Sequence, residues 1–599
     1  MNMKDYKTVF MGRHIFVFVL IAMLVGIMTF PLIFNLGKQI PAFFSSDESY
    51  APIWDGWRIK YSTAHNLSLD KTFLINYPFG VDLRGSGYAS YVWGGLIWFL
   101  NIIGTPILAY NIQVLANFFL MGVIIYLLAL YLTNNVYASF FSAVIFAFCP
   151  YQFARTWQHL GLTYNQWIPL IIFSAIMLKD SDSGKNRLLF FLSVLLLLSF
   201  DWSIIYIAGV AFTGYLAYCL FYNWKTKISG ASALVFKDLA YLKRVIIIGV
   251  ISLTVFSPQF FPVVRNMTHP PVAKASAFNP LNRPFTDLFT QSAKPLSYLL
   301  PAAVHPVFGK FTDQFIGSPL YGVSYTEHTL YLGWVPIILA FIAYRKWRKN
   351  KKLRITNNED FYIGLFVFLA IVAWLFSQPP YFTFPYFKVY MPSFFMYKIL
   401  PMFRAYCRFG IVVMFAVSVL AGFGLKFILE RFKSNRAKAL FTSLACGLVL
   451  FEFVNFPPFK VMDLTKYPKV YDWLKNQDGD LVIAEYPLDT GGSNEYYKFC
   501  QTIHEKKIIN GTIPGTHANM VAKSIMRLST PETAGVLGWM KVKYVFVHLE
   551  PYGQFTDMEE VEEFEKIKTR RLPGLRFLQN VDDVDVYEVT ARPTKPDVK

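Results

Sequence analysis

Two adjacent carboxylates, Asp47 and Glu48, follow soon after the first long apolar run of the chain. They lie in a loop, residues 35–87, that opens where this run, His14–Phe34, is expected to leave a membrane. A carboxylate at a membrane surface can accept the proton of a hydroxyl group or bind a divalent cation such as Mg or Mn. Asp47, and after it Glu48, are therefore the candidate catalytic residues, as base or as metal ligand.

The same loop carries two bases among aromatic residues. Trp54, Trp57 and Tyr61 recur at helical spacing, with Arg58 and Lys60 between them. An amphipathic helix of this kind is expected at the membrane interface, with its rings at headgroup level and its bases toward lipid phosphates. Arg58 and Lys60 are the candidate substrate-binding residues of this loop.

Other ionisable residues interrupt or border apolar runs. Arg155 and His159 lie one helical turn apart in a break that begins near Pro150. Ionisable groups at membrane depth usually serve a function, so both are candidate binding residues. The alternative is that they only satisfy polar groups at the helix break.

Four more candidates come from later loops: Glu327, Lys398, Arg404 and Arg408. The three bases precede an apolar run and could stabilise the charge that develops on a leaving phosphate. The alternative for the arginines is simple extension toward the interface, and for Glu327 a charge favoured by a helix dipole.

Apolar runs of membrane-spanning character position these residues. Twelve are present: His14–Phe34, Tyr88–Gly104, Ile107–Leu132, Val136–Pro150, Leu160–Leu178, Leu188–Phe200, Ser203–Tyr222, Val245–Val264, Thr329–Tyr344, Phe361–Ser377, Phe409–Leu429 and Ala437–Phe456. We expect about eleven crossings, because residues 136–178 cross once if their two short helices lie end to end. In the alternative, the run at 88–104 is re-entrant and both later runs cross.

The basic charge of the chain indicates orientation. The formal net charge is +19, but only 16% of the 599 residues are charged and 54% are hydrophobic, which excludes a soluble enzyme. With the N-terminus inside, the cytoplasmic loops hold 23 Lys and Arg, against 14 in outer loops more than twice as long. This bias follows the positive-inside rule, and it argues against nucleic-acid binding because the bases border membrane helices.

A different composition begins near Lys460. Residues 460–599 contain 19 Lys and Arg against 21 Asp and Glu, as in a soluble domain. Short apolar runs at Leu481–Ala484 and Val542–His548 predict strands, Met558–Lys568 a helix, and Phe577–Val589 a terminal strand pair. The predicted architecture is a polytopic α-helical membrane domain, residues 1–459, followed by an α/β or α+β soluble domain, residues 460–599, on the outer face.

Several motifs resemble the GT-C class of integral membrane glycosyltransferases, in particular a prokaryotic branch of it. The matching stretches are Ser46-Asp47-Glu48, Tyr77-Pro78-Phe79-Gly80, Phe148-Cys149-Pro150-Tyr151, His159-Leu160, Gln166–Leu170, Glu327 before Tyr331-Leu332-Gly333, and Leu400–Arg404 leading to Arg408-Phe409. The acidic motif departs from the usual Gly-Asp-Pro, so either of its carboxylates could serve as base.

The resemblance implies an inverting sugar transfer at the outer face of the membrane. The donor would be a sugar on polyprenyl phosphate, held among membrane lipids, and the acceptor a glycan, lipid or protein. It also implies a multi-pass protein of a prokaryotic plasma membrane with a GT-C-like fold.

Two other functions remain open. A transporter or flippase for polyisoprenoid-linked glycans would use the same basic sites without a base, although no second half repeats residues 14–178 as an inverted repeat would. A non-catalytic GT-C-like scaffold in glycan assembly is the other, because the acidic motif departs from the family pattern.

Overall fold

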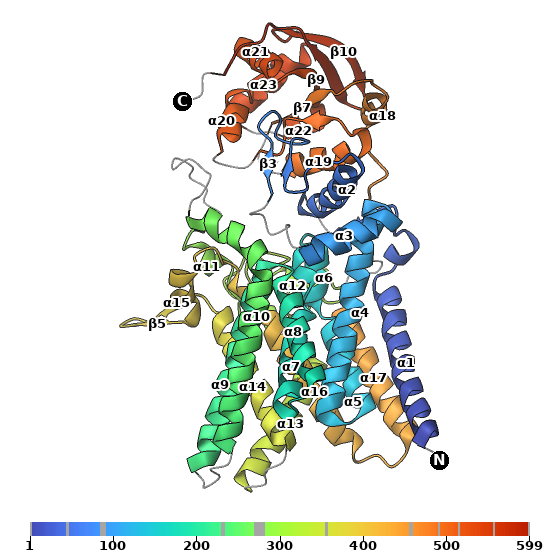
Figure 1. Ribbon diagram of the computed structural model, residues 1–599, viewed down its shortest axis with the longest axis vertical. Helices are drawn as coiled ribbons and strands as arrows, with labels where there is room; N and C mark the ends of the chain where they lie inside the picture. The colour runs from blue at the N-terminus through green and yellow to red at the C-terminus, as the bar shows by residue number, and fades with distance from the viewer. Residues whose placement is uncertain are drawn as a thin grey trace. The chain divides into compact units, whose positions relative to one another are not determined.

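The computed structural model describes residues 3–42, 47–83, 91–228, 234–268, 282–353, 358–454, 459–488, 492–512, 516–554 and 557–596. The chain forms two compact units (Figure 1). The first comprises residues 1–35, 112–257 and 280–461, and the second comprises residues 36–111, 258–279 and 462–599. The long first loop thus belongs to the same unit as the tail.

The first unit is helical. Its main helices are α1 (Met3–Met28), α4 (Pro106–Thr133, whose first turns belong to the second unit), α5 (Val136–Ala147), α6 (Pro150–Thr156), α7 (Trp167–Asp180), α8 (Gly184–Leu198), α9 (Trp202–Ile228), α10 (Leu234–Thr268, whose last turns belong to the second unit), α13 (Trp334–Lys352), α14 (Asn358–Ser377), α16 (Gly410–Leu429) and α17 (Asn435–Phe453). Short elements connect them: η1 (Leu32–Phe34), η3 (Leu160–Thr163), α11 (Asp287–Thr290), η4 (Leu296–Tyr298), α12 (Gly309–Asp313), β4 (Tyr381–Thr383), β5 (Lys388–Tyr390), α15 (Pro392–Ile399) and η5 (Tyr406–Phe409).

Seven helical stretches among the described residues are long and apolar enough to cross a membrane, and His14–Met28 and Val92–Ile103 are shorter apolar helices. Within the described residues, each of the twelve predicted apolar runs overlaps a helix, so the polytopic helical architecture is confirmed. The number of crossings stays a prediction.

Helix α16 forms the centre of this unit. It is buried along nearly its whole length and packs against α5, α13 and α14. A methyl group on Gly424 would lie 1.9 Å from the Leu339 carbonyl oxygen, and one on Gly422 would lie 2.1 Å from Ser142 Oγ. Small residues at these contacts let the backbones approach closely, as in many membrane helix pairs.

The second unit combines the first loop with the tail, and it contains a five-stranded sheet and the two-stranded pairs β1-β6 and β2-β3. Its strands are β1 (Gln39–Pro41), β2 (Lys71–Thr72), β3 (Val81–Asp82), β6 (Val461–Asp463), β7 (Val482–Tyr486), β8 (Lys507–Ile508), β9 (Val542–His548), β10 (Leu575–Val581) and β11 (Val584–Val589). Its helices are η2 (Asp47–Ser49), α2 (Tyr50–Ala64), α3 (Tyr91–Ile103), α18 (Val470–Lys475), α19 (Gly492–His504), α20 (His517–Ser524), α21 (Pro531–Trp539), α22 (Leu549–Tyr552) and α23 (Met558–Lys568).

The five-stranded sheet has the order β10-β11-β9-β7-β8. Strand β7 pairs in parallel with β8 and β9, whereas β11 is antiparallel to both β9 and β10. The predicted strands, the helix over Met558–Lys568 and the terminal hairpin are all present. This confirms an α/β fold for the tail.

The prediction that the helix around Trp54 and Trp57 lies at the membrane interface is wrong. Helix α2 forms, but Trp54 and Trp57 are buried, and α2 packs against α19 of the tail. Trp54 Nε1 donates to Gln501 Oε1 at 2.7 Å. Periodicity shows which face of a helix is apolar, but not whether lipid or protein covers that face.

Candidate functional site

Arg155 lies on α6, a short helix in which every residue is buried. Helix α5 ends at Ala147, because Pro150 lacks the N–H that would continue it. Cys149 is the extended N-cap residue and Pro150 takes the first helical position, where proline is favoured. The helix break expected from the sequence therefore places Arg155 inside the first unit.

A buried amide network fixes this break. Gln152 Nε2 donates to the Thr163 carbonyl at 2.9 Å, and Asn165 Nδ2 donates to Gln152 Oε1 at 2.7 Å. Asn117 Nδ2 donates to Thr163 Oγ1 at 2.6 Å and accepts from Gln166 Nε2 at 2.8 Å. Buried polar networks of this kind rigidify a site, so α6 is held against η3 and α4.

Glu327 bridges two arginines that are distant in sequence. Its Oε2 accepts from Arg155 Nη2 at 2.9 Å, and its Oε1 accepts from Arg408 Nη2 at 2.6 Å. Arg408 Nε lies 3.1 and 3.2 Å from the two oxygens, a forked contact of the kind that arginine makes with carboxylates. Cys407 Sγ also donates to Oε2, at 3.3 Å.

Arg155 retains unused hydrogen-bond donors. Within the described residues, its Nε and Nη1 atoms are buried and have no hydrogen-bond partner. The guanidinium lies over the ring of Tyr151, with 4.5 Å from its central carbon to the ring centroid. Leaving such donors buried and unpaired costs about 1–3 kcal/mol, so an anion or ordered water is expected beside them.

The cluster has an excess of positive charge. Burial alone would raise the pKa of Glu327, but Arg155 and Arg408 outweigh burial and hold that pKa well below its usual value. Glu327 is therefore ionised, and two guanidinium groups share one carboxylate. The side chain of Arg408 is 18% exposed, whereas that of Arg155 is fully buried, so Arg408 is the accessible cation.

The turn that carries Glu327 is held by its own hydrogen bonds. Ser324 Oγ accepts from the Glu327 backbone N–H at 3.1 Å, and His328 Nδ1 accepts from the Ser324 N–H at 3.2 Å. The other ring nitrogen of His328 then donates to the Ser292 carbonyl at 3.1 Å. Gly322 has φ of 100° and lies against this ring, where a side chain would clash.

Three other bases of the first unit have separate environments. Arg404 is exposed and pairs with Asp287 at 3.2 Å. Lys398, on α15, is exposed over the ring of Phe394. His159 is half-buried and contributes to the field that lowers the pKa of Glu327. The structure thus brings Arg155, His159, Glu327 and Arg408 together, and leaves Lys398 and Arg404 outside this cluster.

The first-loop candidates lie in the second unit. Arg58 Nε pairs with Asp55 Oδ1 at 3.3 Å and Arg58 Nη1 donates to the Leu69 carbonyl at 3.1 Å. Burial raises the pKa of Asp55 against the opposing charges of Arg58 and Lys498. Lys60 is exposed, with its Nζ 3.5 Å from the Gly104 carbonyl oxygen.

The carboxylate candidates begin η2. Glu48 is exposed, and the structure describes the backbone of Asp47 but not the environment of its side chain; Ser46 lies outside the described residues. Among the described side chains, no three His, Cys, Asp or Glu residues converge as a metal site would require. The roles of Asp47 and Glu48 stay predictions.

Comparison with solved structures identifies the fold. The arabinofuranosyltransferase AftD from mycobacteria aligns with 96% of this chain at 13% identity, with a TM-score of 0.56. A variant of the same enzyme aligns with a TM-score of 0.50 at 12% identity. The chain has a GT-C fold. It spans about 40% of the length of AftD.

One further solved structure aligns with the chain, and the comparisons with family models and curated sequences find no match. ArnT from Cupriavidus metallidurans, solved with undecaprenyl phosphate, aligns over 97% of this chain and 99% of its own length, at 10% identity and a TM-score of 0.46. No protein-family model and no curated protein sequence matches the chain. The helices and the fold make it a multi-pass membrane protein.

Sequence reasoning missed several residues of the Arg155–Glu327–Arg408 cluster. Cys407 is not among the sequence candidates, yet its thiol donates to Glu327. Ser203 Oγ lies 3.4 Å from Arg408 Nη1, and Tyr151 covers Arg155. The amides Gln152 and Asn165 did carry a signal, because polar residues beside apolar runs need buried partners.

Proposed function

We propose that this protein is an inverting glycosyltransferase that uses a sugar carried on polyprenyl phosphate. The observation that carries the proposal is the buried cluster in which Glu327 aligns Arg155 and Arg408 and leaves an excess positive charge. Such a cluster suits an anionic group that enters from the lipid, because arginine binds phosphate oxygens through a planar fork of donors. The GT-C fold supports the same reaction class.

The reaction is a displacement at the anomeric carbon of the donor sugar. A hydroxyl oxygen of the acceptor attacks this carbon from the face opposite the phosphate, and the bond from the carbon to the phosphate oxygen breaks. The electron pair leaves with polyprenyl phosphate, and the hydroxyl proton passes to a carboxylate. The configuration at the anomeric carbon is inverted, and the leaving phosphate gains one negative charge.

Arg408 is the group that receives this phosphate in our proposal. It is the accessible arginine of the cluster. Glu327 holds its Nε and Nη2 atoms, so Nη1, 3.4 Å from Ser203 Oγ, is the nitrogen that would reach the phosphate. Arg155 acts behind it as a positioning residue, since it holds Glu327 from the other side and adds positive potential. A donor fixed in advance costs no reorganisation as charge develops, which is the basis of electrostatic catalysis.

Asp47 is the proposed base, with Glu48 as second choice. Both follow the first apolar helix, as the sequence motif suggests, and Glu48 is exposed. A divalent cation held by these carboxylates would be the alternative to a base. We expect Asp47→Asn to abolish transfer and Glu48→Gln to reduce it; if the two single variants and the double variant all transfer normally, the assignment is wrong.

The orientation of the protein completes the proposal. The loop charges favour a cytoplasmic N-terminus, which puts Asp47, Glu48 and the tail at the outer face of a plasma membrane. The acceptor is then a glycan, lipid or protein on that side. Cysteine substitution at Ser68 and at Ser434, followed by labelling of intact cells with a membrane-impermeant maleimide, tests this: Ser68 is expected to react and Ser434 to be protected.

The function is tested by transfer from defined donors. Purified protein in lipid nanodiscs is given a panel of polyprenyl-phosphate pentoses and hexoses together with envelope glycans, and released polyprenyl phosphate is measured. We expect Arg408→Gln to lower the rate by about 10²–10³-fold, as for loss of one preorganised donor. Lys310→Gln, an exposed base of the same unit, is the matched control and should transfer normally.

The same preparations separate the competing functions. A flippase would move a labelled lipid-linked sugar across proteoliposomes without an acceptor and without releasing polyprenyl phosphate. A scaffold would do neither. Movement without release, or the absence of release from the whole donor panel, would contradict the transferase proposal.

A further inference from the structure

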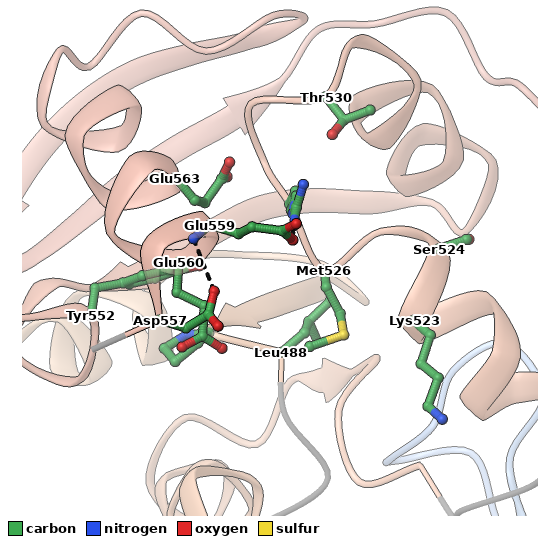
Figure 2. A pocket seen from close by; sticks show the side chains of 12 residues that line it. Leu488, Lys523, Ser524, Met526, Thr530, Tyr552, Asp557, Glu559, Glu560 and Glu563 are labelled. Atoms are coloured by element: carbon green, nitrogen blue, oxygen red, sulfur yellow. Dashed lines mark hydrogen bonds and ion pairs between the residues drawn. The ribbon is translucent and has the colours of Figure 1, made fainter. Parts of the chain in front are cut away.

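The second unit contains a cavity of about 640 Å³ (Figure 2). All the residues that line it come from the tail, and none belongs to the arginine cluster. Pro487 and Leu488, which directly follow β7, form part of its wall. Tyr552, at the end of α22 after β9, forms another part. Ligand sites commonly measure about 300–1,000 Å³, so the cavity has the size of a binding site for a small organic molecule.

The topology of the sheet explains the position of this cavity. From β7 the chain passes through α19 to β8 on one side, and then through α20 and α21 to β9 on the other side. Both connections leave parallel strands, so β7 and β9 flank the point at which the strand order reverses. In open α/β sheets, ligands bind outside the carboxyl ends of the strands at this switch point.

One part of the lining is apolar. Leu488 and Tyr552 are buried, while Met526 is 44% exposed; all three line the cavity (Figure 2). A tyrosine ring together with a flexible thioether offers a surface for C–H groups, and the hydroxyl group at the end of the ring is polar.

Helix α23 supplies the acidic wall. Figure 2 shows the carboxylates of Asp557, Glu559 and Glu560 gathered on one side of the cavity. Much of this acidity is already compensated, because Glu559 pairs with Arg527 and both oxygens of Glu563 accept hydrogen bonds from Ser529.

Two charged side chains of the lining are not engaged in an ion pair among the described residues. Glu560 on α23 and Lys523 on α20 make no ion pair among the described residues. Ser524 and Thr530 line the same cavity, and the Ser524 hydroxyl donates to the Val521 carbonyl at 2.8 Å. The lining therefore offers acceptors, donors and an apolar face within one cavity.

This combination restricts the ligand. Four carboxylates against two bases disfavour phosphates and other anions, since like charges repel at close range. Glu560 and Lys523 are exposed charged groups, and a purely apolar ligand would form no hydrogen bond with either. A molecule with many hydroxyl groups and apolar C–H faces satisfies both walls.

We propose that this cavity binds a saccharide, neutral or bearing an amino group, with its hydroxyl groups on Glu560 and Lys523 and a C–H face on Met526 and Tyr552. The inference deepens the proposed transferase function, on which it rests only for the source of the saccharide: an acceptor glycan or a growing product. The tail would then hold the glycan independently of the donor lipid.

The test uses the full-length protein in nanodiscs without donor lipid. Saturation-transfer NMR is recorded with neutral di- and trisaccharides of pentofuranose and hexopyranose type, with a 2-amino sugar, and with a sugar phosphate as the anionic counterpart. We expect contact with at least one neutral or amino-bearing saccharide and none with the sugar phosphate.

Three variants locate the binding. Glu560→Gln is expected to weaken it about tenfold, as for one hydrogen bond to a charged group. Ser524→Trp should abolish it by filling the cavity from an exposed position. Glu562→Gln removes a neighbouring acid of α23 that pairs with Lys566 and does not line the cavity, so it should bind normally.

The outcomes separate this proposal from the transferase. Saccharide binding that is lost with Ser524→Trp but kept with Arg408→Gln supports the cavity, whether or not transfer is observed. If no saccharide of the panel binds, if Ser524→Trp and Glu560→Gln bind like the wild type, or if only a lysine-rich peptide competes for the site, the proposal is wrong. Thermal unfolding verifies that each variant is folded.

Discussion

The two buried arginine clusters of this protein differ in one respect that bears on function. In the second unit, Arg58 is matched by Asp55 and a backbone carbonyl. In the first unit, Arg155 and Arg408 share the single carboxylate of Glu327, and Arg155 keeps two buried donors without a partner among the described residues. The Arg155–Glu327–Arg408 cluster has an excess positive charge that can attract an anion, whereas the Arg58–Asp55 pair has none.

The pKa values of the two carboxylates reflect this difference. Burial raises the pKa of Asp55, and the neighbouring Arg58 and Lys498 do not reverse the shift. Burial also acts on Glu327, but two arginines overcome it and lower the pKa. An ion pair that is balanced serves mainly the fold, while an unbalanced one suggests a site.

The largest effect is expected from removing the charge of Glu327. Glu327→Gln leaves Arg155 and Arg408 buried without a counter-ion, and loss of one partner of a buried pair costs about 3–5 kcal/mol. Thermal unfolding in detergent should show a strong decrease in stability, and hydrogen exchange should localise it to α6 and η5. Unchanged stability would mean that water already solvates the two arginines.

The next effect concerns transfer. Arg155→Gln still leaves Glu327 forked to Arg408, so the fold should persist while polyprenyl-phosphate release falls about 10²-fold through loss of positioning and charge. Arg155→Lys keeps the charge without the fork and should recover only part of the rate. Full activity of Arg155→Gln in the release assay would remove Arg155 from the site.

The balanced pair should respond in the opposite way. Arg58→Gln leaves Asp55 buried with a weaker partner, so we expect a loss of about 1–3 kcal/mol in the stability of the second unit. Transfer per folded molecule should stay unchanged. A selective loss of transfer with normal unfolding would instead make Arg58 a substrate-binding residue, as its position in the first loop suggested.

The response to acid gives a smaller contrast between the clusters. Because the pKa of Glu327 is lowered on folding, its contribution is present above its unfolded pKa of about 4.3 and is lost as the pH falls through the folded value. Because the pKa of Asp55 is raised, protonation of the folded state first stabilises the second unit as the pH falls. Unfolding of wild type, Asp55→Asn and Glu327→Gln between pH 4 and 7 measures this. Asp55→Asn should remove a gain in stability as the pH falls, and Glu327→Gln should remove a loss that sets in below about pH 5.

The smallest effect is expected at Cys407. A serine hydroxyl can replace the thiol as donor to Glu327, so Cys407→Ser should change the release rate by less than about threefold, within the modest net value of one hydrogen bond. A rate loss of 10²-fold would show that the thiol does more than support Glu327.

Much of the fold could be predicted from the sequence, since apolar length and charge bias are local properties. A helix covers most of each predicted apolar run among the described residues, and the strand over Val542–His548 has the predicted bounds. The association of the first loop with the tail could not be predicted. It depends on contacts such as Trp54 to Gln501, which are 447 residues apart and leave no periodic signal.

The candidate site was predicted as single residues but not as a cluster. Arg155, Glu327 and Arg408 are each candidates in the sequence because a charge near an apolar run is unusual. Their convergence depends on separations of 172 and 81 residues and on the break at α6, which residue spacing does not encode. For the same reason Arg58 and Arg155 looked alike in the sequence, although only one of them has unused donors.

The most direct test of the central claim is binding of polyprenyl phosphate alone, without sugar or acceptor, measured by native mass spectrometry on protein in nanodiscs. The account predicts that Arg408→Gln weakens this binding by about tenfold to a hundredfold, as for charge-assisted hydrogen bonds, and that Arg58→Gln leaves it at the wild-type value. Equal affinity of Arg408→Gln and wild type, or a loss confined to Arg58→Gln, would contradict the assignment of the lipid phosphate to the Arg155–Glu327–Arg408 cluster.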